Sequence, residues 1–96
     1  MLIVTNDYEA IKADPNAVIA FTAGWCQPCR FLKPELVKAS TKTDRNIYVV
    51  DVDVLDQSVL DSFSIRGIPQ IYARAGEDIW VSVAGRTEST ILSEIG

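Results

Sequence analysis

The sequence predicts a single α/β domain, residues 1–96, in which helices cover both faces of a central mixed β-sheet. Three observations support this fold class. Strand-like runs alternate with helical patterns, which is typical of parallel strands joined by crossover helices. Two later runs are close enough to form an antiparallel hairpin. The chain has 96 residues, of which 48% are hydrophobic, and this suffices for one modest core. The predicted order of elements is β-α-β-α-β-α-β-β-α.

The first half of the chain contains two strand-like runs. Leu2–Thr5 is short and β-branched, which predicts a strand. Asn6, with Glu9 three residues later, has the spacing of a capping box and predicts a helix over Asn6–Ala13. After an Asp-Pro-Asn turn signal, Ala17–Ala23 is almost continuously apolar. Such a run is expected of a central strand that is buried on both faces.

The residues after Cys29 predict a helix that extends to about Ser40. Its apolar positions are Phe31, Leu32, Leu36, Val37 and Ala39. Pro34 lies inside this pattern, and the apolar spacing continues beyond it. We therefore expect Pro34 to kink the helix without ending it.

The second half of the chain predicts three strands and two helices. A four-residue connection that contains a glycine, Ala75–Asp78, is expected to join the last two strands. Phe21, Tyr48, Phe63 and Trp80 are interpreted as core aromatics. The predicted elements are the strand Ile47–Val54, the helix Leu55–Phe63, the strands Gln70–Arg74 and Ile79–Val83, and a last helix that Thr87 caps and on which Ile91, Leu92 and Ile95 share one side.

Composition excludes several classes of function. The chain has no histidine, so an imidazole base or a His-ligated metal is impossible. Nine basic and thirteen acidic residues give a net charge of −4, which argues against general nucleic-acid binding. No apolar run approaches the roughly 18 residues of a membrane span, and no basic segment suggests a signal peptide. We therefore expect a cytoplasmic protein that makes no membrane contact.

The only two cysteines, Cys26 and Cys29, are placed where the buried strand turns into the helix. At a helix N-terminus, unpaired N–H groups and the helix dipole favour the thiolate of Cys26. Two intervening residues in a helical turn bring the sulfur atoms within reach of a disulfide. Cys29 lies one turn further in, where apolar surroundings should keep its thiol protonated. This arrangement predicts that Cys26 attacks a disulfide and Cys29 resolves the product.

Other interpretations of the cysteine pair are weaker. A structural zinc site needs four ligands, and one chain supplies two thiols and no histidine, so no metal is expected. A purely structural disulfide would close too small a loop to restrict the unfolded chain much. Two inert core cysteines would not need Trp25 beside them. Redox chemistry is therefore the preferred hypothesis.

Two separate segments resemble thioredoxins. The segment Trp25-Cys26-Gln27-Pro28-Cys29 resembles their active-site sequence, whose usual form is Trp-Cys-Gly-Pro-Cys. The segment from Ser64 to Pro69 resembles the one that ends in a cis-proline facing the disulfide. Pro34 also stands where the family has a helix-kinking proline. The family has glycines at the positions of Gly76, in the hairpin, and Gly85, after the last strand. The resemblance covers essentially the whole chain and implies the thioredoxin fold.

The resemblance also implies a set of site residues. Trp25, Gln27, Pro28 and Pro69 would support the active site. The expected substrate-binding residues around Cys26 are Trp25, Ile68, Pro69, Ala84 and Gly85. A cis Pro69 would leave the backbone of Ile68 free to pair with an extended substrate segment. The electron donor that the family implies is a flavin-dependent thioredoxin reductase.

Three positions depart from the family pattern. Ala20 and Val49 stand where thioredoxins usually carry a buried aspartate and a lysine, so Cys29 lacks the expected general base. Asp51 is interpreted as a solvated residue more readily than as a replacement base. Gln27 replaces the usual glycine between the cysteines and leaves the reduction potential open. Arg86 could steer acidic partners, but we expect an ordinary solvated residue at the start of a helix.

The expected function is that of a thiol–disulfide oxidoreductase that reduces protein disulfides through a reversible Cys26–Cys29 dithiol/disulfide. No bound cofactor is expected, because the cysteine pair stores both electrons. Disulfide-containing proteins would be the substrates, and the chain is expected to be a monomer. The alternative is a binding module or subunit with this fold whose redox activity is weak or incidental. The missing Asp and Lys give that alternative some weight.

Overall fold

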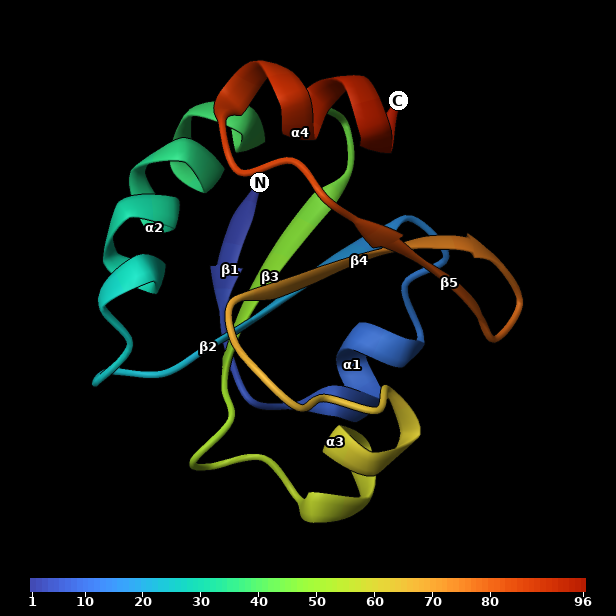
Figure 1. Cartoon of the computed structure of the whole chain (residues 1–96). Helices are drawn as coiled ribbons and strands as arrows, with labels where there is room; N and C mark the ends of the chain where they lie inside the picture. Colours follow the sequence, from blue (N-terminus) through green and yellow to red (C-terminus); the bar gives the residue numbers. More distant parts are fainter.

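Strand β2, Ala17–Thr22, lies at the centre of the sheet in a computed structural model that describes all 96 residues. The sheet has five strands in the order β1-β3-β2-β4-β5 (Figure 1). On one side of β2, β3 (Asn46–Asp51) and β1 (Leu2–Val4) run parallel to it. On the other side, β4 (Gln70–Gly76) is antiparallel to β2, and β5 (Ile79–Val83) is antiparallel to β4. The sheet is therefore mixed, as predicted.

Two helices cover each face of this sheet (Figure 1). Helices α2 (Gln27–Ser40) and α4 (Glu88–Ile95) lie on one face, and α1 (Tyr8–Lys12) and α3 (Gln57–Ser62) on the other. The element order agrees with the prediction, and Thr87 caps α4 as expected. None of these helices combines the length and the apolar character that crossing a lipid bilayer requires.

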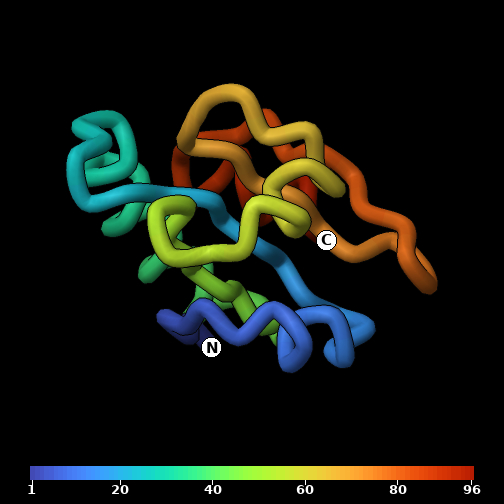
Figure 2. The backbone as a smooth tube through the Cα atoms, turned by 90° about the horizontal axis from the view of Figure 1, so that it is seen from below, coloured from blue at the N-terminus to red at the C-terminus, as the bar shows by residue number.

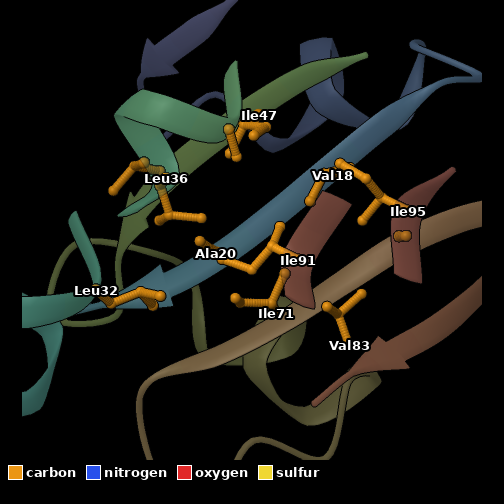
Figure 3. Packing of buried hydrophobic residues seen from close by; sticks show 12 residues of the cluster. Val18, Ala20, Leu32, Leu36, Ile47, Ile71, Val83, Ile91 and Ile95 are labelled. Atoms are coloured by element: carbon orange, nitrogen blue, oxygen red, sulfur yellow. The ribbon is translucent and has the colours of Figure 1, made fainter. Parts of the chain in front are cut away.

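Each face of β2 contributes to a separate core, because all six of its residues are buried and successive side chains point to opposite faces. The core beneath α2 and α4 includes Ala20, Leu36 and Ile91 (Figure 3). The opposite core is rich in aromatic residues, and the predicted core aromatics are found there: Phe21, Tyr48, Phe63 and Trp80. Burial on both faces explains the continuous apolar run in the sequence.

The buried stripe of α2 is narrower than its set of apolar residues. Leu32, Leu36 and Ala39 are buried, but Phe31 is 73% exposed and Val37 is also exposed. Positions 32, 36 and 39 follow the i, i+4, i+7 spacing of one helix face, and Phe31 lies about 100° away from that face. Pro34 does not end the helix, which continues to Ser40.

The start of α1 also differs from the prediction. Asp7, and not Asn6, is the N-cap, and its carboxylate accepts a hydrogen bond from the N–H of Ala10. The Asn6 Oδ1 atom instead accepts from the N–H of Asp51, over 2.8 Å, just where β3 ends. This contact between segments distant in the sequence takes Asn6 away from the helix that it was expected to cap.

Two further boundaries are shifted. β3 ends at Asp51, because the chain turns there and the N–H of Val54 bonds to the carbonyl of Asp51. β4 continues to Gly76, so the connection to β5 is two residues, Glu77 and Asp78, and not four. Asp78 has a φ of 57°, a conformation that aspartate tolerates in tight turns. Figure 2 shows this hairpin reaching out at one edge of the molecule.

Candidate active site

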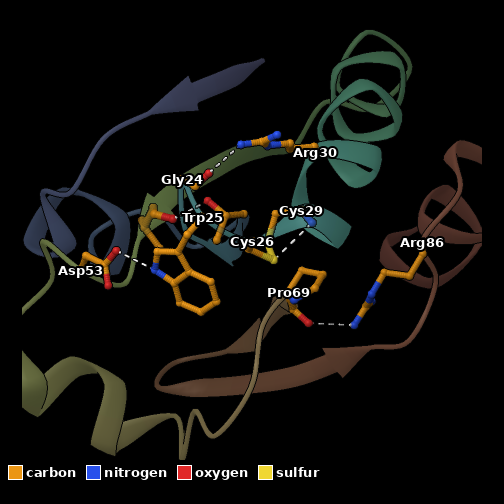
Figure 4. Close-up of a disulfide and its surroundings, with 10 residues drawn as sticks. Gly24, Trp25, Cys26, Cys29, Arg30, Asp53, Pro69 and Arg86 are labelled. Carbon is orange, nitrogen blue, oxygen red and sulfur yellow. Dashed lines mark hydrogen bonds between the residues drawn. A yellow bond between two sulfur atoms is a disulfide. The ribbon is translucent and has the colours of Figure 1, made fainter.

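The two cysteines lie at the junction between β2 and α2 and form a disulfide, with Cα atoms 5.3 Å apart (Figure 4). Cys26 is the N-cap of α2, and its sulfur accepts a hydrogen bond from the N–H of Cys29 over 3.3 Å. Pro28 lies in the first turn, where a missing N–H costs nothing. A donor at a helix N-terminus, aimed at Sγ of Cys26, favours the thiolate when the disulfide is reduced.

Both cysteines are buried among apolar groups. Cys26 is 3% exposed and Cys29 is 1% exposed. They pack with Ala23, and Val52 and Ile68 lie against them. Apolar surroundings disfavour a charged sulfur without a hydrogen-bond donor, and the bond described above gives such a donor to Cys26. The site is therefore asymmetric, with Cys26 the better supported as a thiolate.

Trp25 stands beside the disulfide and is 68% exposed, so it is a surface residue and not part of the core. Its Nε1–H donates a hydrogen bond to Oδ2 of Asp53 over 2.9 Å (Figure 4). The backbone of Asp53 is fixed in turn, because its N–H donates to the Asp51 carboxylate over 2.8 Å. The Asp51 carboxylate therefore serves as a hydrogen-bond acceptor within this turn. An exposed indole held in one orientation presents an apolar surface next to Cys26.

The loop before β4 forms another wall of the site. The Ile68–Pro69 peptide bond is cis, as the resemblance implied. Ile68 packs against the cysteines, while its N–H and its carbonyl form no hydrogen bond in the structure. Unpaired backbone groups at the edge of a site can accept an added extended segment.

The Ala84–Gly85 turn is held by α4. The N–H groups of Ala84 and Gly85 both donate to the carboxylate of Glu94. Sequence reasoning did not identify Glu94, because the contact joins residues nine and ten positions apart across a turn. A Cβ atom on Gly85 would lie 2.7 Å from Thr90 and from Glu94, which explains a glycine here.

Arg86 differs most from its prediction. We expected an ordinary solvated residue, but it is partly buried and donates to three backbone carbonyls: those of Val83, Gly85 and Pro69. Figure 4 shows Arg86 and Pro69 on one side of the disulfide and Trp25 and Asp53 on the other. Arg86 thus connects the Ala84–Gly85 turn to the cis-proline loop. Only long-range contacts reveal this role.

Two of the three departures from the family pattern, Ala20 and Val49, lie together in the core. Ala20 and Val49 are partners in the parallel register of β2 and β3, and both are buried. Their core consists of apolar side chains. A general base for Cys29 is therefore missing at this position. Gln27 is exposed between the cysteines, and its side chain forms no hydrogen bond.

Comparison with known proteins agrees with this geometry. A family model described as thioredoxin matches residues 2–96. A thioredoxin H-type of Brassica oleracea is 35% identical over 92 residues, which cover 94% of this chain and 74% of the relative. Thioredoxin H3 of Arabidopsis thaliana is 36% identical over 80 residues, covering 81% of this chain and 66% of the relative.

Comparison with solved structures also indicates the thioredoxin fold. The thioredoxin of Schistosoma mansoni superposes with a TM-score of 0.82 at 28% identity, covering 98% of this chain and 92% of that one. The expected fold is thereby confirmed. With its close cysteine pair at a helix N-terminus, the chain belongs to the thioredoxin family and is a thiol–disulfide oxidoreductase of the protein disulfide reductase type.

Proposed function

We propose that Cys26 is the nucleophile and Cys29 the resolving cysteine in the reduction of protein disulfides. The Cys26 thiolate attacks one sulfur of the substrate and forms a mixed disulfide, and the other substrate sulfur leaves as a thiolate. The Cys29 thiolate then attacks Sγ of Cys26, which releases the second substrate thiolate and closes the Cys26–Cys29 bond. The substrate gains two electrons, the cysteine pair loses them, and protons restore the substrate thiols.

The observation that carries this assignment is the hydrogen bond from the Cys29 N–H to the sulfur of Cys26 at the start of α2. It stabilises negative charge on Cys26 when that cysteine attacks and when it leaves. The free backbone of Ile68 and the exposed Trp25 offer a surface on which an extended substrate segment can bind next to that sulfur. In this proposal, Pro28, Pro69, Ala84 and Gly85 complete the substrate-binding surface.

The remaining parts of the proposal concern partners and compartment. The cysteine pair stores both electrons, so the reaction needs no bound cofactor. A flavin-dependent thioredoxin reductase would return the electrons. A pair that must be reduced after each turnover suits a reducing compartment, so we place the protein in the cytoplasm, acting as a monomer and an electron carrier.

The test combines two variants with an insulin reduction assay. Wild-type protein with dithiothreitol should precipitate insulin chains, and Cys26→Ser should have no activity above dithiothreitol alone. Cys29→Ser should accumulate a mixed disulfide on Cys26, which mass spectrometry of peptides locates. An inactive wild type would support the binding-module alternative. A mixed disulfide found on Cys29 in Cys26→Ser, formed as fast as on Cys26, would overturn the assigned roles.

A further inference from the structure

Arg86 is held rigidly at the edge of the active site. Its Nη1 donates to the carbonyls of Val83 and Gly85 over 2.8 and 2.9 Å, and its Nη2 donates to that of Pro69 over 3.3 Å. Three bonds to separate backbone groups fix the plane of the guanidinium. A ligand that binds there therefore does not have to immobilise a flexible arginine.

The charge of Arg86 is not neutralised within the chain. The structure contains two ion pairs, Lys38 with Glu35 and Lys42 with Glu88, and neither involves Arg86. The Nε–H of Arg86 and one hydrogen of its Nη2 have no hydrogen-bond partner. A partly buried cation with two free donors can bind a carboxylate.

A hollow of about 280 Å³ lies next to this cation, lined by Pro28, Phe31, Leu32, Pro69 and Arg86. Four of the five lining residues are apolar, and Phe31 is the exposed aromatic that α2 does not bury. Pro28 lies between the two cysteines in the chain, and Pro69 and Arg86 lie on the side of the disulfide opposite Trp25 (Figure 4). The hollow therefore lies beside the disulfide, on the side away from the tryptophan.

We propose that this hollow is a subsite for an acidic side chain of the substrate, a glutamate or aspartate within two residues of the reacting cysteine. The inference rests on the proposed function, because it places the substrate segment along Ile68. A residue of an extended chain advances about 3.3 Å, so side chains this close to the cysteine reach the neighbouring walls. The methylene groups of a glutamate would pack against Phe31 and the prolines, and its carboxylate would accept from Arg86.

An apolar side chain fits the hollow less well. It would remove water from Arg86 without giving the guanidinium a charged partner, and a desolvated, unpaired charge is unfavourable. A carboxylate compensates for that loss, and the apolar walls strengthen the attraction by excluding water. The subsite thus selects for negative charge, although the protein as a whole carries a net charge of −4.

The test uses peptides that differ at one residue. Each carries one cysteine joined to 2-thiopyridine, with Glu, Gln or Leu at a position within two residues of it. Each reduced protein attacks one peptide and releases one thiopyridone, whose absorbance gives the second-order rate constant of this single turnover. We expect the best Glu peptide to react about three- to tenfold faster than its Gln counterpart. The preference should shrink at high salt.

Two variants assign the preference to Arg86. Arg86→Gln should react equally with the Glu and Gln peptides, and Arg86→Lys, which keeps the charge, should retain part of the preference. Arg66→Gln is the matched control, because it removes the same charge from an exposed residue of the nearby loop that does not line the hollow. This control should keep the full preference.

The outcomes separate this inference from the proposed function. Equal wild-type rates with Glu and Gln peptides at every position, or the fastest rate with Leu, overturn the subsite while leaving the reductase intact. A uniform loss with all peptides in Arg86→Gln, with the Glu preference retained, shows that Arg86 only positions the loop and also overturns the subsite. A wild type that reacts with none of the peptides overturns the proposed function as well.

Discussion

Ala20 and Val49 face each other across the parallel strands β2 and β3, at the positions where thioredoxins usually carry a buried aspartate and a lysine. Both side chains belong to the core that also contains Leu32 and Leu36. The pair is therefore purely apolar and offers no acceptor for the proton of Cys29. We therefore expect that a mutation which supplies a base at this position would accelerate the deprotonation of Cys29.

Introducing the absent base should accelerate resolution. We expect Ala20→Asp to raise the rate at which the mixed disulfide is released by at least about tenfold, because a positioned base contributes that much or more. The gain should grow with pH as the new carboxyl ionises. It should be accompanied by a loss of about 2–4 kcal/mol in the free energy of unfolding, because the carboxylate is buried. Stopped-flow kinetics and urea unfolding measure the two effects.

Ala20→Asn is the control for this change. It introduces a polar group of similar size that cannot accept the proton, so it should cost stability without accelerating release. A release rate for Ala20→Asp that equals the wild-type rate from about pH 6 to pH 9 would contradict the idea that Cys29 lacks a base.

The hydrogen bond between Trp25 and Asp53 should matter for substrate binding. We expect Asp53→Ala to raise the KM for insulin about two- to fivefold with little change in kcat, because an untethered indole no longer presents a fixed surface. Asp53→Asn keeps an acceptor oxygen and should behave like the wild type. Steady-state kinetics separate KM from kcat, and a fall in kcat alone would show that Asp53 does not act through the orientation of Trp25.

Space, and not backbone conformation, explains the glycine at position 85. In Gly85→Ala, the new Cβ would lie 2.7 Å from the carbonyl carbon of Thr90 and 2.7 Å from the carboxylate of Glu94. We expect a loss of about 1–3 kcal/mol in the free energy of unfolding, measured by urea denaturation. Gly67→Ala, where nothing lies within 4 Å, should change stability by less than about 0.5 kcal/mol. Equal stabilities for the two variants would contradict the crowding argument.

Asp14 should make stability depend on pH. Burial raises the pKa of its carboxyl, but hydrogen bonds from the Asn16 N–H, from the Asn46 amide and from the Tyr48 hydroxyl, together with the charge of Arg45, outweigh this and hold the pKa below its ordinary value. A carboxyl whose folded pKa is depressed stabilises the protein fully above its unfolded pKa of about 3.9. That contribution is lost as pH falls through the lower folded value.

Asp14→Asn should therefore lower the free energy of unfolding at neutral pH by roughly 1 kcal/mol, because it weakens these bonds. The difference from the wild type should shrink in acid, once the pH falls below the depressed folded pKa and the wild-type carboxyl is protonated as well. Thermal unfolding across pH measures both. Asp44→Asn, at an exposed residue whose side chain forms no hydrogen bond, is the control. A difference for Asp14→Asn that stays constant down to pH 2 would refute the assignment.

The local sequence was sufficient for the parts of the site that depend on neighbouring residues. Cys26 and Cys29 could be placed at a helix N-terminus because a continuous apolar run precedes them and helical spacing follows them. The same reasoning identified the central strand and the core aromatics. Sequence reasoning was less accurate where two neighbouring residues could serve as the same helix cap. It selected Asn6 over Asp7 as the cap of α1, because the bond that occupies Asn6 comes from β3.

By itself, the sequence determined the fold class, the order of the elements and the cysteine pair, since apolar periodicity and the spacing of two residues are local properties. Only the tertiary structure decided where Phe31 and Arg86 lie relative to that pair. Phe31 is exposed because α2 turns the face with Leu32 and Leu36 to the sheet. Arg86 is partly buried because its own turn is packed against the distant cis-proline loop, whose Pro69 carbonyl accepts from its guanidinium. Such contacts depend on how distant strands and helices pack, so no local pattern contains them.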